Sequence, residues 1–202
     1  MLAQRMEPDL GPLLLDRAQG GPAAWAHPLL ATAAELEDVK SGGGLNIEAL
    51  EISPDRQQLL IGFRSPLQGS LAIIASVENP AAVIESDAVP QVSSTLLALD
   101  LGGHGIRGMA YVAALDGYLV ISGPALRTQT AFGLWFWSGQ PEAPARRVTV
   151  AGLDGFERAE GLCPAVIDGE PRIIIVSDDG SRKEGRCARF VLLEPGQLQI
   201  AP

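Results

Sequence analysis

The sequence predicts an all-β protein: a partial β-propeller of three four-stranded antiparallel blades, preceded by a short N-terminal helix. Three observations predict this fold. A short motif recurs three times along the chain, many short apolar segments have the length of strands, and several of these segments are apolar throughout. Repetition at such a period, built from short strands, is typical of stacked β-units.

The repeated motif opens each unit and places one charged residue among small and apolar ones. Its three copies begin at Ile47, Ile106 and Ala159. Their charged members are Glu48, Arg107 and Glu160, which are 59 and 53 residues apart. The spacing divides the chain into three units of similar size.

Composition favours a packed globular protein and disfavours several classes of partner. The chain has 202 residues, of which 47% are hydrophobic and 19% charged, with a net charge of −9. An acidic protein repels nucleic acid and anionic membranes, so we expect neither as a partner. No segment approaches the ~20 apolar residues of a membrane span, and the sequence therefore predicts a soluble cytoplasmic protein.

The N-terminal part is expected to contribute little to the sheets. Residues 1–27 lack periodicity and are predicted to form a poorly ordered arm. Pro28 then opens a segment rich in alanine and leucine that continues to Glu37, which predicts a short helix because proline suits the first helical turn. Residues 28–202 form the predicted propeller, with blades at about 45–102, 105–153 and 158–201.

Each blade is predicted to contain four strands. In the first they are Ile47–Ser53, Leu59–Arg64, Leu71–Val77 and Leu96–Leu101. In the second they are Ile106–Val112, Tyr118–Ser122, Phe132–Trp137 and Arg147–Val150. In the third they are Gly161–Ile167, Ile173–Ser177, Cys187–Leu193 and Leu198–Ile200. Turn signals such as Asp116-Gly117 and Asp168-Gly169 separate them.

Several strands are apolar without alternation, for example Leu59–Ile61, Tyr118–Ile121 and Ile173–Val176. Such a strand is covered on both faces, which a radial stack of small sheets provides. Cys163 and Cys187 fall in predicted strands, and we expect both to be buried apolar residues.

An ordered set of motifs resembles an uncharacterised bacterial domain-of-unknown-function family with a propeller-like fold. The motifs are Gly44–Leu50, Leu59–Leu67, Gly105–Met109, Ser122–Pro124, Leu134–Trp137, Ala159–Leu162 and Ser177–Gly180. More distantly, the chain is similar to the "esterase-like activity of phytase" propellers and to the gluconolactonase and strictosidine-synthase-like groups. The resemblance implies a propeller and carries over no established activity.

Members of the resembled family are longer, so the resemblance implies that the N-terminal blades are missing here. Three blades form an open arc, whereas closed propellers have four to eight. An open arc leaves two apolar sheet faces uncovered, which implies association. The expected partner is a second copy in a homodimer, or separately encoded remaining blades. The alternative is a truncated gene product without activity.

The first strand of each propeller blade lines the central channel, so the repeated charged residues are expected to meet near one mouth. Glu48 and Glu160, with Asp178 at the end of a third-blade strand, are candidate ligands for Ca²⁺, which prefers oxygen ligands. Arg64 and Arg107 are candidate binding residues for an anionic substrate.

Two further residues complete the candidate site. Asn46 lies two residues before Glu48 and joins the substrate-binding set. His104 lies just before Arg107 and is the candidate general base. The structural interpretation is that the charged residues only hold the blades in register through ion pairs.

The predicted function is a ligand-binding or assembly module of unknown activity. The alternative is a Ca²⁺-dependent hydrolase of the phosphoesterase or lactonase type, with its site at the channel mouth and calcium as its cofactor. The sequence contains no G-x-S-x-G nucleophile motif and no spaced zinc ligands.

Overall fold

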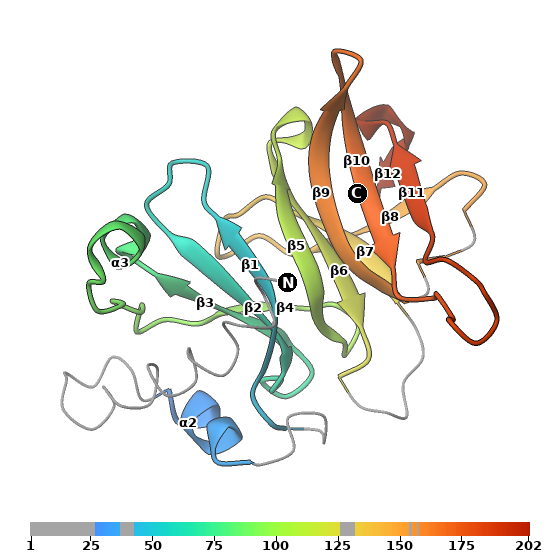
Figure 1. The fold of residues 1–202 in the computed structure, drawn as a ribbon. Coiled ribbons are helices and arrows are strands. Elements are labelled where there is room, and N and C mark those ends of the chain that lie inside the picture. The colour runs from blue at the N-terminus through green and yellow to red at the C-terminus, as the bar shows by residue number, and fades with distance from the viewer. Residues whose placement is uncertain (1–26, 37–42, 126–131, 154, 157) are drawn as a thin grey trace.

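The structure, a computed structural model, describes residues 27–36, 43–125, 132–153, 155–156 and 158–202. Within these ranges it contains three antiparallel sheets and two short α-helices (Figure 1). The all-β prediction is confirmed. The predicted poorly ordered arm lies outside the described residues, except for His27.

The first sheet has the strand order β1-β2-β3-β4, in which every strand pairs with its neighbour along the chain. Its strands are β1 (Asn46–Ile52), β2 (Leu59–Ser65), β3 (Ala72–Val77) and β4 (Leu97–Leu99). These four bounds agree with the predicted strands to within two residues. β3 is buried at every position, as expected for an apolar strand inside a stack.

The second sheet has the order β12-β8-β7-β6-β5 and the third has the order β11-β10-β9. The strands are β5 (Gly105–Val112), β6 (Gly117–Gly123), β7 (Gly133–Trp137), β8 (Arg146–Val150), β9 (Ala159–Ile167), β10 (Glu170–Ser177), β11 (Phe190–Leu193) and β12 (Leu198–Ile200). Asp168 and Gly169 join β9 to β10 with positive φ angles of 54° and 81°. This is the conformation that Asp-Gly hairpin turns favour.

The prediction of four strands in every sheet is wrong for two of the three sheets. β12 was expected beside β11 but pairs instead with β8, where Leu198 lies opposite Val150 and Ile200 opposite Val148. The chain passes from β11 in the third sheet to β12 in the second through a short 3₁₀ turn, Pro195–Gln197. There Leu198 and Ile200 pack against the core between the second and third sheets, which gives this short strand an apolar surface to cover.

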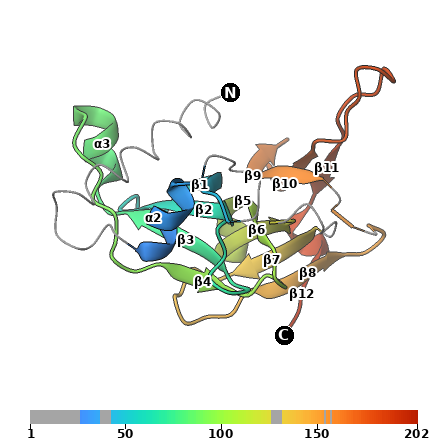
Figure 2. The same cartoon turned by 90° about the horizontal axis from the view of Figure 1, so that it is seen from below.

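The three sheets lie side by side, with the second in the middle (Figures 1 and 2). Their first strands are neighbours, because β5 contacts both β1 and β9. One core cluster fills the space between the first and second sheets and includes Leu60, Ile106 and Trp137. A second cluster fills the space between the second and third sheets and includes Leu119 and Ile173.

Two helices cover the outer face of the first sheet. α2 (Pro28–Ala34) is the predicted N-terminal helix, and its Leu29 and Leu30 pack against that face. α3 (Pro80–Ser86) was not predicted, although Pro80 opens it as a first-turn proline. Val83 of α3 packs against the same face.

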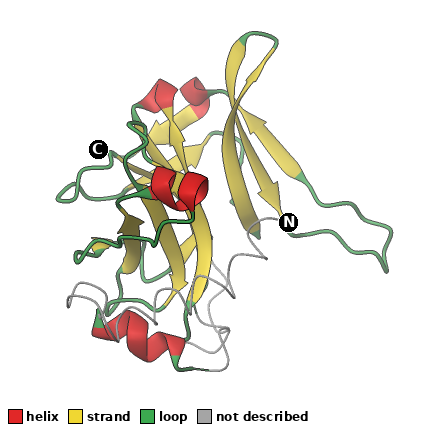
Figure 3. Ribbon diagram, turned by 60° about the vertical axis from the view of Figure 1, so that its left-hand side comes forward, coloured by secondary structure: helices red, strands yellow, loops and turns green. Residues whose placement is uncertain are grey.

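The outer face of the third sheet has no such cover among the described residues. We call it the open face, and define it by Cys163, Ala165, Ile174, Val176, Phe190 and Leu192. Cross-strand pairing puts these side chains on one side, since Ile174 pairs with both Cys163 and Leu192 and Val176 pairs with Phe190. Phe190 is 68% exposed, Val176 46% and Leu192 44%. Figure 3 shows this sheet at one end of the row.

Side-chain exposure around the third sheet contradicts two expectations from the sequence. β10 was predicted to be covered on both faces, yet Val176 is exposed on one. Cys163 and Cys187 were predicted to be buried, yet both are exposed free thiols. Cys163 lies on the open face, and Cys187 precedes β11 rather than lying in it.

No helix in the described ranges is long and apolar enough to cross a membrane.

Candidate functional site

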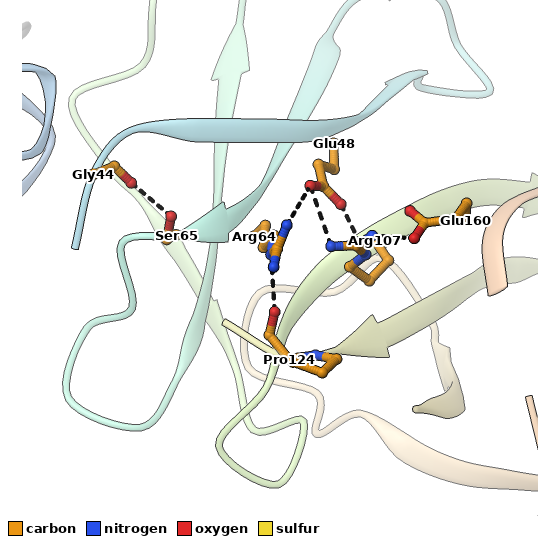
Figure 4. A network of polar contacts seen from close by, with 7 residues as sticks. All are labelled: Gly44, Glu48, Arg64, Ser65, Arg107, Pro124 and Glu160. Atoms are coloured by element: carbon orange, nitrogen blue, oxygen red, sulfur yellow. Dashed lines mark hydrogen bonds and ion pairs between the residues drawn. The ribbon is translucent and has the colours of Figure 1, made fainter. Parts of the chain in front are cut away.

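The structure brings together four of the predicted site residues, which we call the charged cluster: Glu48, Arg64, Arg107 and Glu160 (Figure 4). Glu48 lies on β1 and Arg64 on β2 of the first sheet. Arg107 lies on β5 of the second sheet and Glu160 on β9 of the third. The cluster therefore draws on all three sheets.

Each residue of the charged cluster is the extra residue of a β-bulge. In the first sheet, Ile47 pairs with Phe63 and Ala49 with Gly62, which leaves Glu48 without an opposite residue. A bulge bends its strand and redirects the extra side chain. The repeated motif of the sequence is thus a repeated bulge.

The same irregularity occurs at the other members. Arg107 falls between Ile106 and Gly108, whose partners on β6 are adjacent residues. Glu160 falls between Ala159 and Gly161 in the same way. Arg64 is skipped on β2, because Asn46 pairs with Ser65 while Ile47 pairs with Phe63. The bulges of β1, β5 and β9 direct their charged side chains toward one another.

Arg107 is the centre of the charged cluster. Its Nε lies 2.9 Å from Glu48 Oε2, and its Nη1 donates to Glu48 Oε1 at 3.3 Å. Its Nη2 forms an ion pair with Glu160 Oε1. Arg107 is only 8% exposed, and its guanidinium lies 5.9 Å from the centre of the Phe132 ring. One buried arginine therefore joins the first sheet to the third.

Arg64 adds a second link between the first two sheets. Its Nη1 lies 3.3 Å from Glu48 Oε1, and its Nε donates to the carbonyl oxygen of Pro124 at 2.8 Å. Pro124 directly follows β6. Ser65 donates to the carbonyl oxygen of Gly44 at 2.6 Å and fixes the end of β2 beside the start of β1.

Burial controls the electrostatics of the charged cluster. The pKa of Glu48 is raised because removing its carboxylate from water outweighs the attraction of Arg107 and Arg64, and the charge of Glu160 raises it further. Two arginines and two glutamates make the cluster formally neutral. A neutral, mutually paired set suits a structural junction better than an anion-binding pocket.

The remaining predicted residues lie around the charged cluster rather than in it. Asn46 is buried at the start of β1. His104 lies in the loop before β5, where its Nδ1 is 3.2 Å from the carbonyl oxygen of Leu101. Among the described residues, no hydrogen bond or ion pair joins His104 to the cluster. Asp178 is exposed after β10, and its backbone N–H donates to the carbonyl oxygen of Arg158 at 2.8 Å.

Asp179 anchors the segment between β10 and β11. Its buried carboxylate accepts hydrogen bonds from the Arg189 backbone N–H at 2.9 Å and from Ser177 Oγ at 3.0 Å, and it pairs with the Arg189 side chain. The bonds from the Arg189 backbone and side chain lower the pKa of Asp179 to about 2.

The predicted calcium ligands are not gathered into a metal centre. Within the described ranges, no group of three or more His, Cys, Asp or Glu side chains is placed to hold a metal ion. Glu48 and Glu160 both face Arg107, and an ion that took their oxygens would have to displace that arginine. The donor set therefore does not fit Ca²⁺ as the structure stands.

A separate cavity of about 550 Å³ lies at the end of the third sheet. Its lining is mainly apolar and includes Phe156, Ile175 and Phe190, with Ser177 and Arg189 as polar members. It shares Phe190 with the open face and no lining residue with the charged cluster. Ser177 and Arg189 already bond to Asp179, so the polar groups of this cavity are engaged.

Comparison with known proteins gives one family. The family described as "Protein of unknown function (DUF3616)" matches residues 36–190, which contain the charged cluster, the core between the first and second sheets and most of the open face. No curated protein and no solved structure matches the chain.

Proposed function

This chain belongs to the DUF3616 family of proteins of unknown function, and we propose that it is an assembly module: an incomplete β-propeller that associates through the open face of its third sheet. In this proposal the three sheets are consecutive blades. The proposal is supported by the side-by-side sheets, the adjacent first strands β1, β5 and β9, and the bulge that each of these strands has at its charged residue.

The observation that carries the proposal is the difference between the two ends of the row of sheets. At one end, α2 and α3 cover the apolar outer face of the first sheet. At the other, Phe190, Val176 and Leu192 are exposed together on the third. A contiguous apolar patch on one face of a sheet marks an interaction surface, and another sheet face is its natural complement.

The charged cluster has a supporting role in this proposal. Ion pairs from Arg107 to Glu48 and Glu160 fix the rotation of each sheet relative to the next, so the open face is presented in a defined orientation. The same pairs favour the assembly role over a Ca²⁺-dependent hydrolase, because both carboxylates needed for the cation are already bound to Arg107.

Sedimentation equilibrium over a range of protein concentrations tests the proposal. We expect the wild-type chain to associate reversibly and Phe190→Ser to shift the protein toward the monomer. Ile84→Ser is the matched control, because Ile84 is 74% exposed on α3, at the opposite end of the row of sheets from the open face (Figure 1). It should associate like wild type. A folded wild-type chain that stays monomeric to millimolar concentration would overturn the assembly role.

A further inference from the structure

We infer that the occupant of the open face is a second copy of this chain, packed with its strands antiparallel to those of the first. The two copies are related by a two-fold axis that lies in the interface, perpendicular to β10 and near Ile174. This inference rests on the proposed assembly role and adds to it the identity of the partner and the geometry of the contact.

The charges at the two ends of the third sheet carry the inference. At one end, Asp168 in the turn between β9 and β10 and Glu170 at the start of β10 carry a formal charge of −2. Arg172, two residues further along β10, forms an ion pair with Glu194 at 3.4 Å, and this pair adds no net charge. At the other end, the segment Ser181–Arg186 has three basic residues against one acidic residue, a formal charge of +2. In Figure 1 the turn is at the top of this sheet and the segment below it.

With one acidic and one basic end on each sheet, two copies bring opposite charges together only when the strands of one copy run antiparallel to those of the other. A two-fold axis in the interface and perpendicular to the strands exchanges the two ends of the sheet. It therefore places the acidic turn of each copy toward the basic segment of the other. An axis parallel to the strands would bring like charges together. Opposite charges at matched positions across an interface steer association and fix its register.

A β-bridge and an ion pair fix the conformation of the basic segment, Ser181–Arg186. Ser181 and Arg186 form a β-bridge, with hydrogen bonds between their backbones at 2.8 and 2.9 Å. Arg186 also pairs with Glu184 at 3.0 Å. Arg182 and Lys183 are exposed at the tip of this small hairpin and supply its excess positive charge.

The proposed axis preserves the order of the strands across the interface. β9 then faces β9, β10 faces β10 and β11 faces β11. Cys163 on β9 and Leu192 on β11 each pair with Ile174 on β10, so an axis near Ile174 places the two copies of Cys163 opposite each other. Packed sheets are ~10 Å apart, which is too far for a disulfide but within reach of a short bifunctional reagent.

The size of the open face predicts a weak complex. Three strands ~4.8 Å apart and up to nine residues long span roughly 14 by 30 Å, or roughly 420 Å². Stable interfaces bury about 800 Å² per partner. With the charged ends added, the contact remains at the low end of specific interfaces. Each copy has a net charge of −9, so the two copies repel each other overall. The orientation of the complex therefore depends on the opposite charges at the matched ends of the sheets.

Cysteine-specific cross-linking tests the geometry with native residues. A bismaleimide with a spacer of ~10 Å, chosen to match the distance between packed sheets, should link two chains through Cys163 in a Cys187→Ser background. The matched control is the Cys163→Ser background, which leaves Cys187. The antiparallel arrangement separates the two copies of Cys187, so this control should give little dimer. A dimer linked mainly through Cys187 would overturn the proposed axis.

Charge exchange tests the source of the orientation. Asp168→Lys with Glu170→Lys makes both ends basic, and Arg182→Glu with Lys183→Glu makes both ends acidic. Each double variant should associate at least tenfold more weakly than wild type, and an equimolar mixture of the two should regain wild-type affinity. All four substitutions in one chain should also restore association.

The outcomes separate this inference from the proposed function. If Phe190→Ser weakens association but neither the Cys163 link nor the charge exchange behaves as expected, the open face is an assembly surface with another geometry, and the inference is wrong. If the chain is monomeric in sedimentation, both the assembly role and the second copy are wrong. Unchanged association of the charge variants overturns the charge-based orientation.

Discussion

Arg107 determines whether the carboxylates of the charged cluster are compensated. It is buried, and it is the one described cation that pairs with both Glu48 and Glu160. Removing one partner of a buried ion pair leaves an uncompensated charge, which costs more than the pair itself contributes. The stability of the sheet junction should therefore depend on this side chain more than on either glutamate.

We expect Arg107→Met to lower the free energy of unfolding by about 3 kcal/mol, the lower end for breaking a buried pair, because the Glu160 side chain is 33% exposed and keeps some water. Urea denaturation measures it. Arg182→Met, which removes an exposed arginine, should change the value by less than ~0.5 kcal/mol. Equal effects of the two substitutions would contradict the central role of Arg107.

Glu48 should give stability an unusual pH dependence. Burial raises its pKa in the folded state, so the folded protein holds this proton to higher pH than the unfolded chain. The stability of wild type relative to Glu48→Gln is then greatest below the ordinary carboxyl pKa, and it falls as pH rises through the folded-state pKa. Urea denaturation of both proteins between about pH 4 and 7 should show this decline.

The ionisation of Asp179 should change stability with pH in the opposite direction to that of Glu48. Its pKa is lowered to about 2 by hydrogen bonds from Arg189. Its contribution is therefore present above the unfolded-state pKa and is lost as pH falls toward 2. Asp179→Asn should differ from wild type at neutral pH and converge with it in acid. For Glu48, the opposite result would contradict the prediction. If the free energy of unfolding of wild type relative to Glu48→Gln increased with pH, the attraction of Arg64 and Arg107 would outweigh the burial of the Glu48 carboxylate.

At the scale of elements, the close approach of neighbouring sheets depends on glycines beside the bulges. A Cβ on Gly62 would lie 2.9 Å from both Ala49 Cβ and Ile106 Cγ2. A Cβ on Gly105 would overlap the carbonyl oxygen of Arg64. The start of β5 can lie against the end of β2 only because Gly105 has no side chain.

We expect Gly105→Ala to destabilise the fold by at least ~3 kcal/mol, since overpacking against a backbone atom forces the two sheets apart. Gly196→Ala is the matched control, because no atom lies within 4 Å of the place its new methyl group would occupy and its φ is not positive. Thermal unfolding of both variants measures the difference. A Gly105→Ala protein as stable as the control would show that the sheets can separate freely.

The sequence predicted the strands well because each is a short apolar run between turn residues. β10 and β6 were predicted from such runs, and the Asp168-Gly169 turn joined the expected neighbours. The partner of β12 could not be predicted in this way. Leu198–Ile200 has only three residues, and local rules pair it with the preceding strand. The free edge of β8 that it fills is a property of the folded sheet.

The sequence predicted which charged residues meet in the cluster but not how their side chains are oriented. The spacing of Glu48, Arg107 and Glu160 indicated that equivalent positions would meet, and the structure brings them together. The bulges that aim these side chains need the pairing register, which no single strand reveals. Arg64 was expected to bind an anion, but its Nε donates to the backbone of Pro124, a partner without any side-chain signature.

At the scale of the whole molecule, the sheets are coupled too closely to unfold one at a time. The middle sheet contributes to both inter-sheet cores, and the charged cluster joins all three sheets. Local openings should therefore be confined to the connecting segments, while the cores open together.

We expect a single cooperative unfolding transition. Far-ultraviolet circular dichroism follows all strands, while tryptophan fluorescence in a Trp25→Phe background follows Trp135 and Trp137 on β7 alone. The two urea curves should coincide, as two-state unfolding requires. Hydrogen exchange that opened β9 to β11 well before β5 to β8 would contradict this coupling.

The crossing of β12 sets the order in which the molecule can be completed during synthesis. Its partner strand ends at Val150, and β12 begins at Leu198. At ordinary elongation rates of ~5 to 20 residues per second, the ribosome needs roughly 2 to 10 s to make the intervening chain. During that interval β8 lacks the strand that pairs with its outer edge in the folded sheet. β12 then pairs with this edge and connects the end of the third sheet to the second.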